Sequence, residues 1–250
     1  SAQAQVSHYG GLRDVEVPTE RSKSAVSNTA DSSGSADASA ESEDLSESFT
    51  ESFDKDFWDR GWTPRTLIGN PNGDYFVMGP KRLSFKLPFT EVYEYLLNDQ
   101  TAHTDGRIEA TFENIRSAEA SYGVVCRYND LGWYELRVNI AGPLQGSYAV
   151  YKYDQILKNN GQVPYVRLHP NMIQYFTSDL KLGLNVRNKL GLDCTGNKIR
   201  VFINDKEQAA TLNAPIIDGQ FADGIAGVMV ESYGKSTVDM DFVGFSVTIP

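Results

Sequence analysis

The chain has 250 residues, of which 40% are hydrophobic, and it carries a formal net charge of −10. This length and apolar content suit one large β domain or two small ones. The acidic balance and the lack of a basic patch argue against nucleic acid and anionic membranes as partners. No stretch approaches the ~18 apolar residues that a membrane-spanning helix needs, so no membrane span is expected.

The first segment, residues 1–48, is acidic and poor in apolar residues. Its nine acidic and three basic residues give it a net charge of −6. Between Ser22 and Ser48 there are ten serines and five alanines. Such a composition buries too little surface to offset the entropy lost on ordering. We therefore interpret residues 1–48 as an extended low-complexity arm and residues 49–250 as a β-sandwich domain.

Two short strand-like patches flank Gly10-Gly11 in this arm, within residues 5–17. A tethered extended strand can add to the edge of a neighbouring sheet, which would join identical subunits. A serine-rich stalk that spaces the domain from a surface, or an arm folded back on its own domain, are the alternatives. The predicted assembly residues are Val6, His8, Tyr9, Leu12, Val15 and Val17.

Beyond Phe49, apolar and polar residues alternate with a period of two in many short runs. In residues 133–138, for example, Trp133, Glu135 and Arg137 share one face of the expected strand. Asn204-Asp205 predicts a two-residue hairpin turn. Similar runs occur at residues 107–113, 123–128, 148–153, 198–203 and 238–249. Many short strands separated by glycine and asparagine turns predict an all-β antiparallel sandwich or barrel.

The order of several motifs along residues 49–250 carries a family resemblance. They include Tyr122-Gly-Val-Val-Cys126-Arg-Tyr128, Trp133-Tyr-Glu-Leu-Arg-Val138, Gly146-Ser-Tyr-Ala-Val-Tyr-Lys152, Cys194-Thr-Gly196 and Phe221-Ala-Asp-Gly224. This order resembles the concanavalin A-like lectin/glucanase superfamily, in its branch of extracellular bacterial modules related to laminin-G-like domains. The resemblance implies a jelly roll of two curved sheets, with any ligand on the concave face or at the loop rim. In similar modules, the pair matching Cys126 and Cys194 often bridges neighbouring strands.

Glu109 and Glu113 are the candidate catalytic carboxylates. Glycosidases that this chain resembles place carboxylates two and four positions apart on one strand, facing the cleft, and Glu109, Thr111 and Glu113 share a face. Residues four apart on a strand are ~13 Å apart, whereas a retaining pair needs carboxyl groups ~5 Å apart. Thr111 also replaces the central aspartate of those enzymes. We therefore expect a solvated face and no catalytic residue, and hydrolysis by this pair is only the third hypothesis.

Flat aromatic rings are the candidate sugar contacts, namely Trp133, Tyr148 and Tyr153. Such rings stack on sugars or fill protein interfaces, and a buried core position is the alternative. No cofactor or metal is expected, because His8, His103 and His169 have no ligand spacing and the Asn-Asp pairs are turn formers. A calcium ion at a loop rim remains an alternative.

Two features favour secretion. Cys126 and Cys194 are compatible with one disulfide in an oxidising compartment. The opening Ser1-Ala-Gln-Ala-Gln resembles the region around a signal-peptidase cut, although a shortened chain would look the same. Together with the arm, these features favour a non-enzymatic extracellular structural subunit of a filament, sheath or matrix. A carbohydrate-binding or adhesion module on a serine-rich stalk is the alternative, and fold alone does not decide between them.

Overall fold

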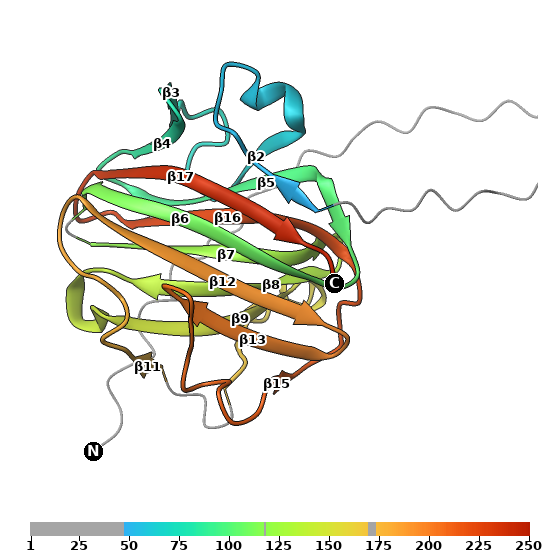
Figure 1. The fold of residues 1–250 in the computed structure, drawn as a ribbon. Coiled ribbons are helices and arrows are strands. Elements are labelled where there is room, and N and C mark those ends of the chain that lie inside the picture. The colour runs from blue at the N-terminus through green and yellow to red at the C-terminus, as the bar shows by residue number, and fades with distance from the viewer. Residues whose placement is uncertain (1–47, 118, 170–173) are drawn as a thin grey trace, which may run out of the picture. The chain divides into compact units, whose positions relative to one another are not determined.

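The computed structural model describes residues 48–117, 119–169 and 174–250. They form two antiparallel sheets that face each other across one core (Figure 1). This confirms the predicted all-β jelly-roll sandwich. The predicted assembly residues, from Val6 to Val17, lie outside the described residues. None of the helices in the described ranges is long and apolar enough to cross a membrane.

The first sheet, called sheet A below, has nine strands. Seven follow the order β14-β13-β12-β6-β17-β4-β3, while β1 pairs with β17 and β15 with β13. The strands are β1 (Phe49–Thr50), β3 (Phe76–Gly79), β4 (Arg82–Leu87), β6 (Gly106–Arg116), β12 (Val186–Thr195), β13 (Lys198–Ile203), β14 (Lys206–Glu207), β15 (Ile216–Ile217) and β17 (Val238–Thr248).

The second sheet, called sheet B, has eight strands. Seven follow the order β10-β9-β8-β7-β16-β5-β2, and β11 pairs with β9. The strands are β2 (Trp62–Ile68), β5 (Glu91–His103), β7 (Ala120–Asn129), β8 (Gly132–Asn139), β9 (Ser147–Asp154), β10 (Tyr165–Arg167), β11 (Tyr175–Phe176) and β16 (Gly224–Tyr233).

Three short helices complete the described residues: η1 (Phe57–Arg60), η2 (Gly142–Leu144) and α1 (Gln155–Asn159). Helix α1 connects β9 to β10 at one edge of sheet B. It begins at Asp154, whose carboxylate accepts hydrogen bonds from the backbone N–H groups of Ile156 and Leu157. This cap satisfies two of the first N–H groups of the helix and fixes where β9 ends.

The core follows directly from the alternation in the sequence. On β6, Ile108, Ala110 and Phe112 are buried between the sheets, while Glu109 and Glu113 point to the other side. The predicted hairpin turn joins β13 to β14, and Asn204 and Asp205 both have positive φ angles (51° and 68°). Positive φ at both central residues is what the hairpin turn of this type requires.

The disulfide joins the two sheets. Cys126 lies on β7 of sheet B and Cys194 on β12 of sheet A, and the structure links their sulfur atoms. The bond therefore crosses the core, whereas the resemblance implied a bridge between neighbouring strands. Both residues are fully buried.

Strand β8 differs from the other strands because all eight of its residues are buried. Tyr134, Leu136 and Val138 face the main core between the sheets. On the opposite side, Trp133 belongs to a second cluster that lies on the outer face of sheet B. A strand buried on both faces of a two-sheet sandwich needs an additional cover on its outer side, and this cover defines the candidate site.

Candidate functional site

The outer face of sheet B is concave, so side chains from distant strands of the sheet meet above it. Tyr165 lies on the edge strand β10, and four strands separate it from Tyr93 on β5. In a flat sheet their backbones would be roughly 24 Å apart, given ~4.8 Å between strands. Their ring centroids are only 5.9 Å apart. The outer face of sheet B is therefore strongly concave, and we call the space it encloses the sheet B groove.

Glu135 lies at the centre of this groove and is completely buried. Its carboxylate accepts hydrogen bonds from the hydroxyls of Tyr93 (2.8 Å) and Tyr95 (2.7 Å) on β5. It also accepts one from the indole N–H of Trp133 (3.0 Å). Hydrogen bonds of this number keep a buried carboxylate from being unsatisfied. Glu135 thus ties β8 to β5 across two intervening strands.

Arg137, two residues after Glu135 on β8, binds a second carboxylate as well, that of Glu231. Its guanidinium pairs with Glu135 at 2.5 Å and with Glu231 of β16 at 3.2 Å. The carbon at its centre lies over the rings of Tyr93 (4.8 Å), Tyr151 (4.8 Å) and Tyr165 (5.1 Å). Cation–π contacts of this kind strengthen when the cation is desolvated. The groove therefore contains an aromatic cage that is already filled by the chain's own arginine.

Burial shifts the acid–base properties of these groups. It raises the pKa of Glu135 to about 8, against hydrogen bonds from Trp133 and Tyr95 that lower it. Burial, together with the charge of Glu135, also raises the pKa of the Tyr95 and Tyr165 hydroxyls well above 10. A low-dielectric site disfavours the charged form of each group. The two tyrosine hydroxyls consequently remain protonated donors throughout the physiological range.

The structure corrects the predicted sugar contacts. Trp133 and Tyr153 lie on the groove but are buried, and Tyr148 is buried on the core side. Both faces of the Trp133 indole are covered, by Tyr153 at 3.9 Å and by Tyr128 at 4.7 Å between ring centroids. A ring covered on both faces cannot stack on a sugar. Trp133 and Tyr153 instead support the rings beside them.

Tyr128 ends this row of stacked rings and is partly exposed. Its one aromatic neighbour within the described residues is Trp133, so its other face is not covered by a ring. Burial raises the pKa of Tyr128, and the nearby charge of the exposed Arg65 on β2 lowers it. The mouth of the groove therefore combines an aromatic face, a hydroxyl donor and a guanidinium.

The predicted carboxylate pair lies elsewhere. Glu109 and Glu113 are on the outer face of sheet A, not in the sheet B groove. Glu109 pairs with Arg107 (2.8 Å) and Lys189 (3.0 Å), and Glu113 pairs with Arg187 (2.6 Å). Both glutamates are partly exposed and ion-paired, in agreement with the expected solvated face. Neither lies in the sheet B groove.

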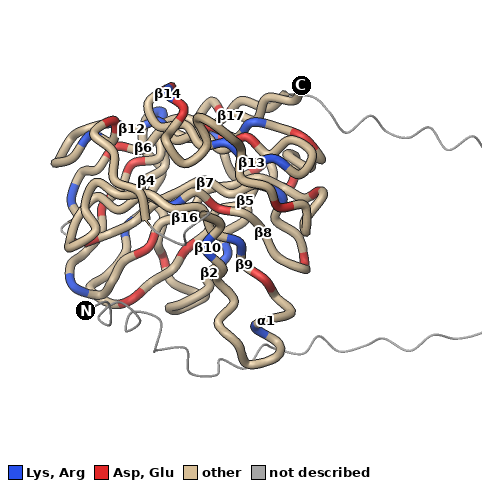
Figure 2. Tube along the Cα trace, turned by 90° about the horizontal axis from the view of Figure 1, so that it is seen from below, with Lys and Arg blue, Asp and Glu red and all other residues tan. Residues whose placement is uncertain are grey.

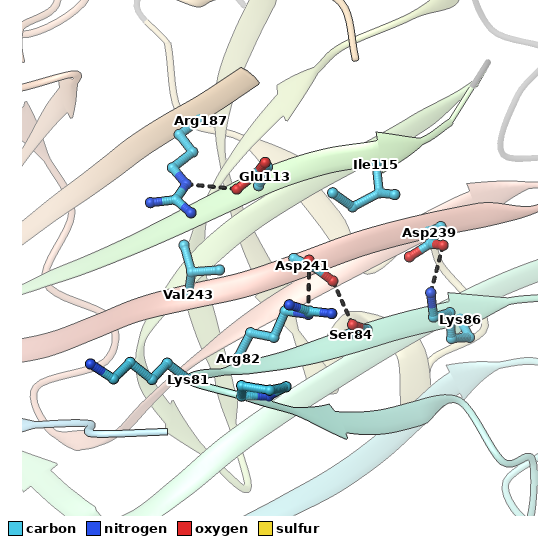
Figure 3. A pocket seen from close by; sticks show the side chains of 11 residues that line it. Lys81, Arg82, Ser84, Lys86, Glu113, Ile115, Arg187, Asp239, Asp241 and Val243 are labelled. Carbon is cyan, nitrogen blue, oxygen red and sulfur yellow. Dashed lines mark hydrogen bonds and ion pairs between the residues drawn. The ribbon is translucent and has the colours of Figure 1, made fainter. Parts of the chain in front are cut away.

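A hollow of about 560 Å³ opens on the outer face of sheet A (Figure 3). Its floor includes Asp241, which accepts a hydrogen bond from Ser84 (2.5 Å) and pairs with Arg82 (3.1 Å). Asp239 pairs with Lys86 at 2.5 Å. The complete lining is Pro80, Lys81, Arg82, Ser84, Lys86, Glu113, Ile115, Arg187, Asp239, Asp241 and Val243.

Acidic and basic residues are interspersed over the described chain rather than gathered in a belt of one sign (Figure 2). This distribution gives no broad basic surface of the kind that follows a nucleic-acid backbone. Among the residues that the structure describes, no group of three or more His, Cys, Asp or Glu side chains could hold a metal ion.

Sequence reasoning missed most of the groove. Glu135 and Arg137 share a face with Trp133 by simple alternation, and this was a usable signal. Tyr93, Tyr95 and Tyr165 are 32 to 40 positions away from Trp133 along the chain, so only the curl of the sheet brings them together.

Several solved structures with the same fold are named as proteins that bind or cleave sugars, and another is a galectin-like protein of unknown function from Bacillus subtilis. The carbohydrate-binding module CBM66 from Bacillus subtilis superposes with a TM-score of 0.51 and 14% identity, covering 73% of this chain and 91% of that one. The β-glucanase from Bacillus licheniformis gives 0.52 and 12%, covering 82% and 99%. LamA from Zobellia galactanivorans, in complex with laminaritriose and laminaritetraose, gives 0.53 and 9%, covering 80% and 97%.

These similarities confirm the two-sheet jelly-roll fold that the resemblance implied. No protein-family model and no curated protein sequence matches the chain. The prediction of a structural filament subunit is wrong by this comparison, since the similar structures are a carbohydrate-binding module and glucanase-type proteins. The prediction that the chain is not an enzyme is overturned by the same finding, because several of these structures are glycoside hydrolases.

Proposed function

We propose that the chain is a carbohydrate-binding module whose ligand contacts the mouth of the sheet B groove. The observation that carries this proposal is the row of stacked rings on the concave face, which ends in the partly exposed ring of Tyr128. A flat apolar ring beside polar donors is the combination that orients a sugar. The carbohydrate-binding module CBM66, which has the same fold, supports this choice.

The buried part of the groove supports the mouth and is not itself open to a ligand. Trp133 holds the Tyr128 ring from below, and Trp133 is in turn fixed by Tyr153 and by its hydrogen bond to Glu135. A rigid supported ring loses little conformational entropy when a sugar stacks on it. We also infer that the protein is extracellular, because a disulfide such as Cys126–Cys194 persists in oxidising compartments.

The test is a glycan array followed by titration calorimetry of each sugar that binds. Laminari-oligosaccharides belong in the first set, because LamA was crystallised with them. Tyr128→Ala should weaken binding about tenfold or more, equivalent to ~1.4 kcal/mol. Phe89→Ala is the matched control, since Phe89 is 64% exposed and does not belong to the cluster of side chains on the outer face of sheet B. The affinity of this variant for the sugar should equal that of the unmodified protein.

Two results would contradict the proposal. If no carbohydrate on the array binds, the function is wrong. If a sugar binds but Tyr128→Ala has no effect, the sugar does not contact the mouth of the groove. Release of reducing ends from every bound glycan is measured in the same samples, because glucanases share this fold.

A further inference from the structure

We propose that the hollow on the outer face of sheet A is a second binding site, and that its ligand is an acidic polysaccharide. This site is independent of the sheet B groove, because the two lie on the outer faces of different sheets. The carboxylates of the hollow lie deep and its cations lie at the surface. The ligand is therefore expected to meet positive charge first.

The exposed fractions of the side chains show this layering. Arg82, Lys86 and Arg187 are 44%, 41% and 65% exposed. Their partners Asp241, Asp239 and Glu113 are only 10%, 22% and 20% exposed. In Figure 3 the three pairs come from four neighbouring strands and surround one space.

Lys81 adds a fourth cation at the turn between β3 and β4. It is exposed and has no ion-pair partner among the described residues, and it extends away from Arg82 at one end of the hollow (Figure 3). Four cations against three carboxylates leave the hollow with a surplus of one positive charge, on a chain whose net charge is −10. A local cationic site on an acidic protein selects for negatively charged ligands at short range.

Each carboxylate of the hollow is paired with a cation, and only Asp239 keeps one buried oxygen without a hydrogen-bond partner. Both oxygens of Asp241 have partners, one in Ser84 and one in Arg82. Asp241 and Glu113 are direct cross-strand neighbours, an arrangement of like charges that needs cations beside it. Arg82 and Arg187 supply these cations while leaving several of their N–H donors for a ligand.

The spacing of the cations favours a polymer over a small anion. Arg82 and Lys86 are four residues apart on β4, roughly 13 Å, and Arg187 lies three strands away from them, roughly 14 Å. A single sulfate or phosphate could bridge two neighbouring cations such as Arg82 and Arg187, but the whole set from Lys86 to Arg187 needs a longer ligand. Double-stranded DNA carries a charge every ~1.7 Å along its axis, so the acidic chain repels it more strongly than a polysaccharide whose charges are spaced more widely. Ile115 and Val243 offer an apolar floor for sugar CH groups.

The experiment measures binding of polygalacturonate and dextran sulfate by affinity electrophoresis and calorimetry at 50 and 300 mM salt. Neutral dextran and a DNA oligonucleotide are the comparison ligands. The full chain should bind the two acidic polysaccharides and lose affinity as salt is raised. The Lys81→Gln/Arg187→Gln double variant should bind them at least tenfold more weakly. The matched control, Lys55→Gln/Lys158→Gln, removes the same charge from exposed positions outside the hollow and should bind normally.

Preference for one of the two acidic polymers identifies carboxylate or sulfate as the recognised group. Equal losses in both double variants would overturn the proposal, since only total charge would then matter. Equal binding of dextran would overturn it too, and equally tight DNA binding would show that the ligand class is wrong. Tyr128→Ala should leave acidic-polysaccharide binding unchanged. Loss of that binding would place the ligand in the groove and refute the second site, whereas failure of neutral glycans alone would affect only the proposed function.

Discussion

The hydroxyl oxygens of Tyr95 and Tyr165 are 2.8 Å apart, although four strands of the same sheet lie between their strands. Tyr95 also donates to Glu135, so the two tyrosines close a hydrogen-bonded chain over the centre of the groove. Long-range contacts of this kind stabilise the curvature of the sheet as well as the groove. The proposed mouth at Tyr128 therefore depends on buried residues that do not touch a ligand.

At pH 9, above the raised pKa of Glu135, Arg137→Met is expected to destabilise the protein by about 3–5 kcal/mol, because it leaves the ionised Glu135 buried without its cation. Urea denaturation followed by tryptophan fluorescence measures this change. Arg187→Met is the matched control, since Arg187 is mostly exposed in its pair with Glu113. Its effect should stay within ~1 kcal/mol. Equal effects of the two substitutions would contradict the role of Arg137 in the groove.

The raised pKa of Glu94 predicts that the free energy of unfolding falls as the pH rises. Its side chain is buried on β5, one carboxyl oxygen has no hydrogen-bond partner, and burial raises its pKa to about 7. The folded protein thus holds a proton that the unfolded chain releases near pH 4.5. The contribution of this group is complete below pH 4.5 and is lost as the pH rises through 7, about 3 kcal/mol in all.

Denaturation at several pH values tests this effect. Glu94→Gln should remove the fall between pH 4.5 and 7, because glutamine does not titrate. The difference in free energy of unfolding between the variant and the unmodified protein should therefore grow with pH across this window. A difference that stays constant over the window would show that Glu94 does not titrate with a raised pKa.

The lowered pKa of His169 makes the free energy of unfolding rise with pH, opposite to the effect of Glu94. Its Nε2 accepts a hydrogen bond from the backbone N–H of Val150, and burial, with the nearby Arg167, lowers its pKa to about 4. The unfolded chain then binds a proton near pH 6.5 that the folded protein does not. Its contribution is complete above pH 6.5 and is lost as the pH falls toward 4.

His169→Gln keeps an acceptor for Val150 but cannot titrate. The variant should lose less stability than the unmodified protein between pH 6.5 and 4, by about 3 kcal/mol at most. In the unmodified protein the opposite slopes of Glu94 and His169 largely offset each other between pH 4.5 and 6.5. Parallel pH profiles of His169→Gln and the unmodified protein would refute the assignment.

The disulfide should contribute substantially to stability because it closes a long loop. Cys126 and Cys194 are 68 positions apart, which corresponds to about 4 kcal/mol in the loop-entropy model. The Cys126→Ala/Cys194→Ala double variant should therefore denature at a clearly lower urea concentration, and a reducing agent should affect only the unmodified protein. An unchanged midpoint in the double variant would contradict this role.

The amino-acid sequence by itself determined the local features of the described domain. Alternation assigned Ile108, Ala110 and Phe112 to one face of a strand, and Asn204-Asp205 specified a hairpin turn, because side-chain direction and turn conformation depend on neighbouring residues. From these features the all-β sandwich could be predicted.

Only the tertiary structure decided which faces enclose a site. Alternation separates Trp133, Glu135 and Arg137 from Tyr134 and Leu136, but both sets are buried on β8, so the pattern does not mark the groove. Glu109 and Glu113 have a catalytic-looking spacing, yet their face of sheet A is the outer one. The groove depends on the curl of sheet B, which brings Tyr165 to Tyr95, and curl results from the packing of all strands together.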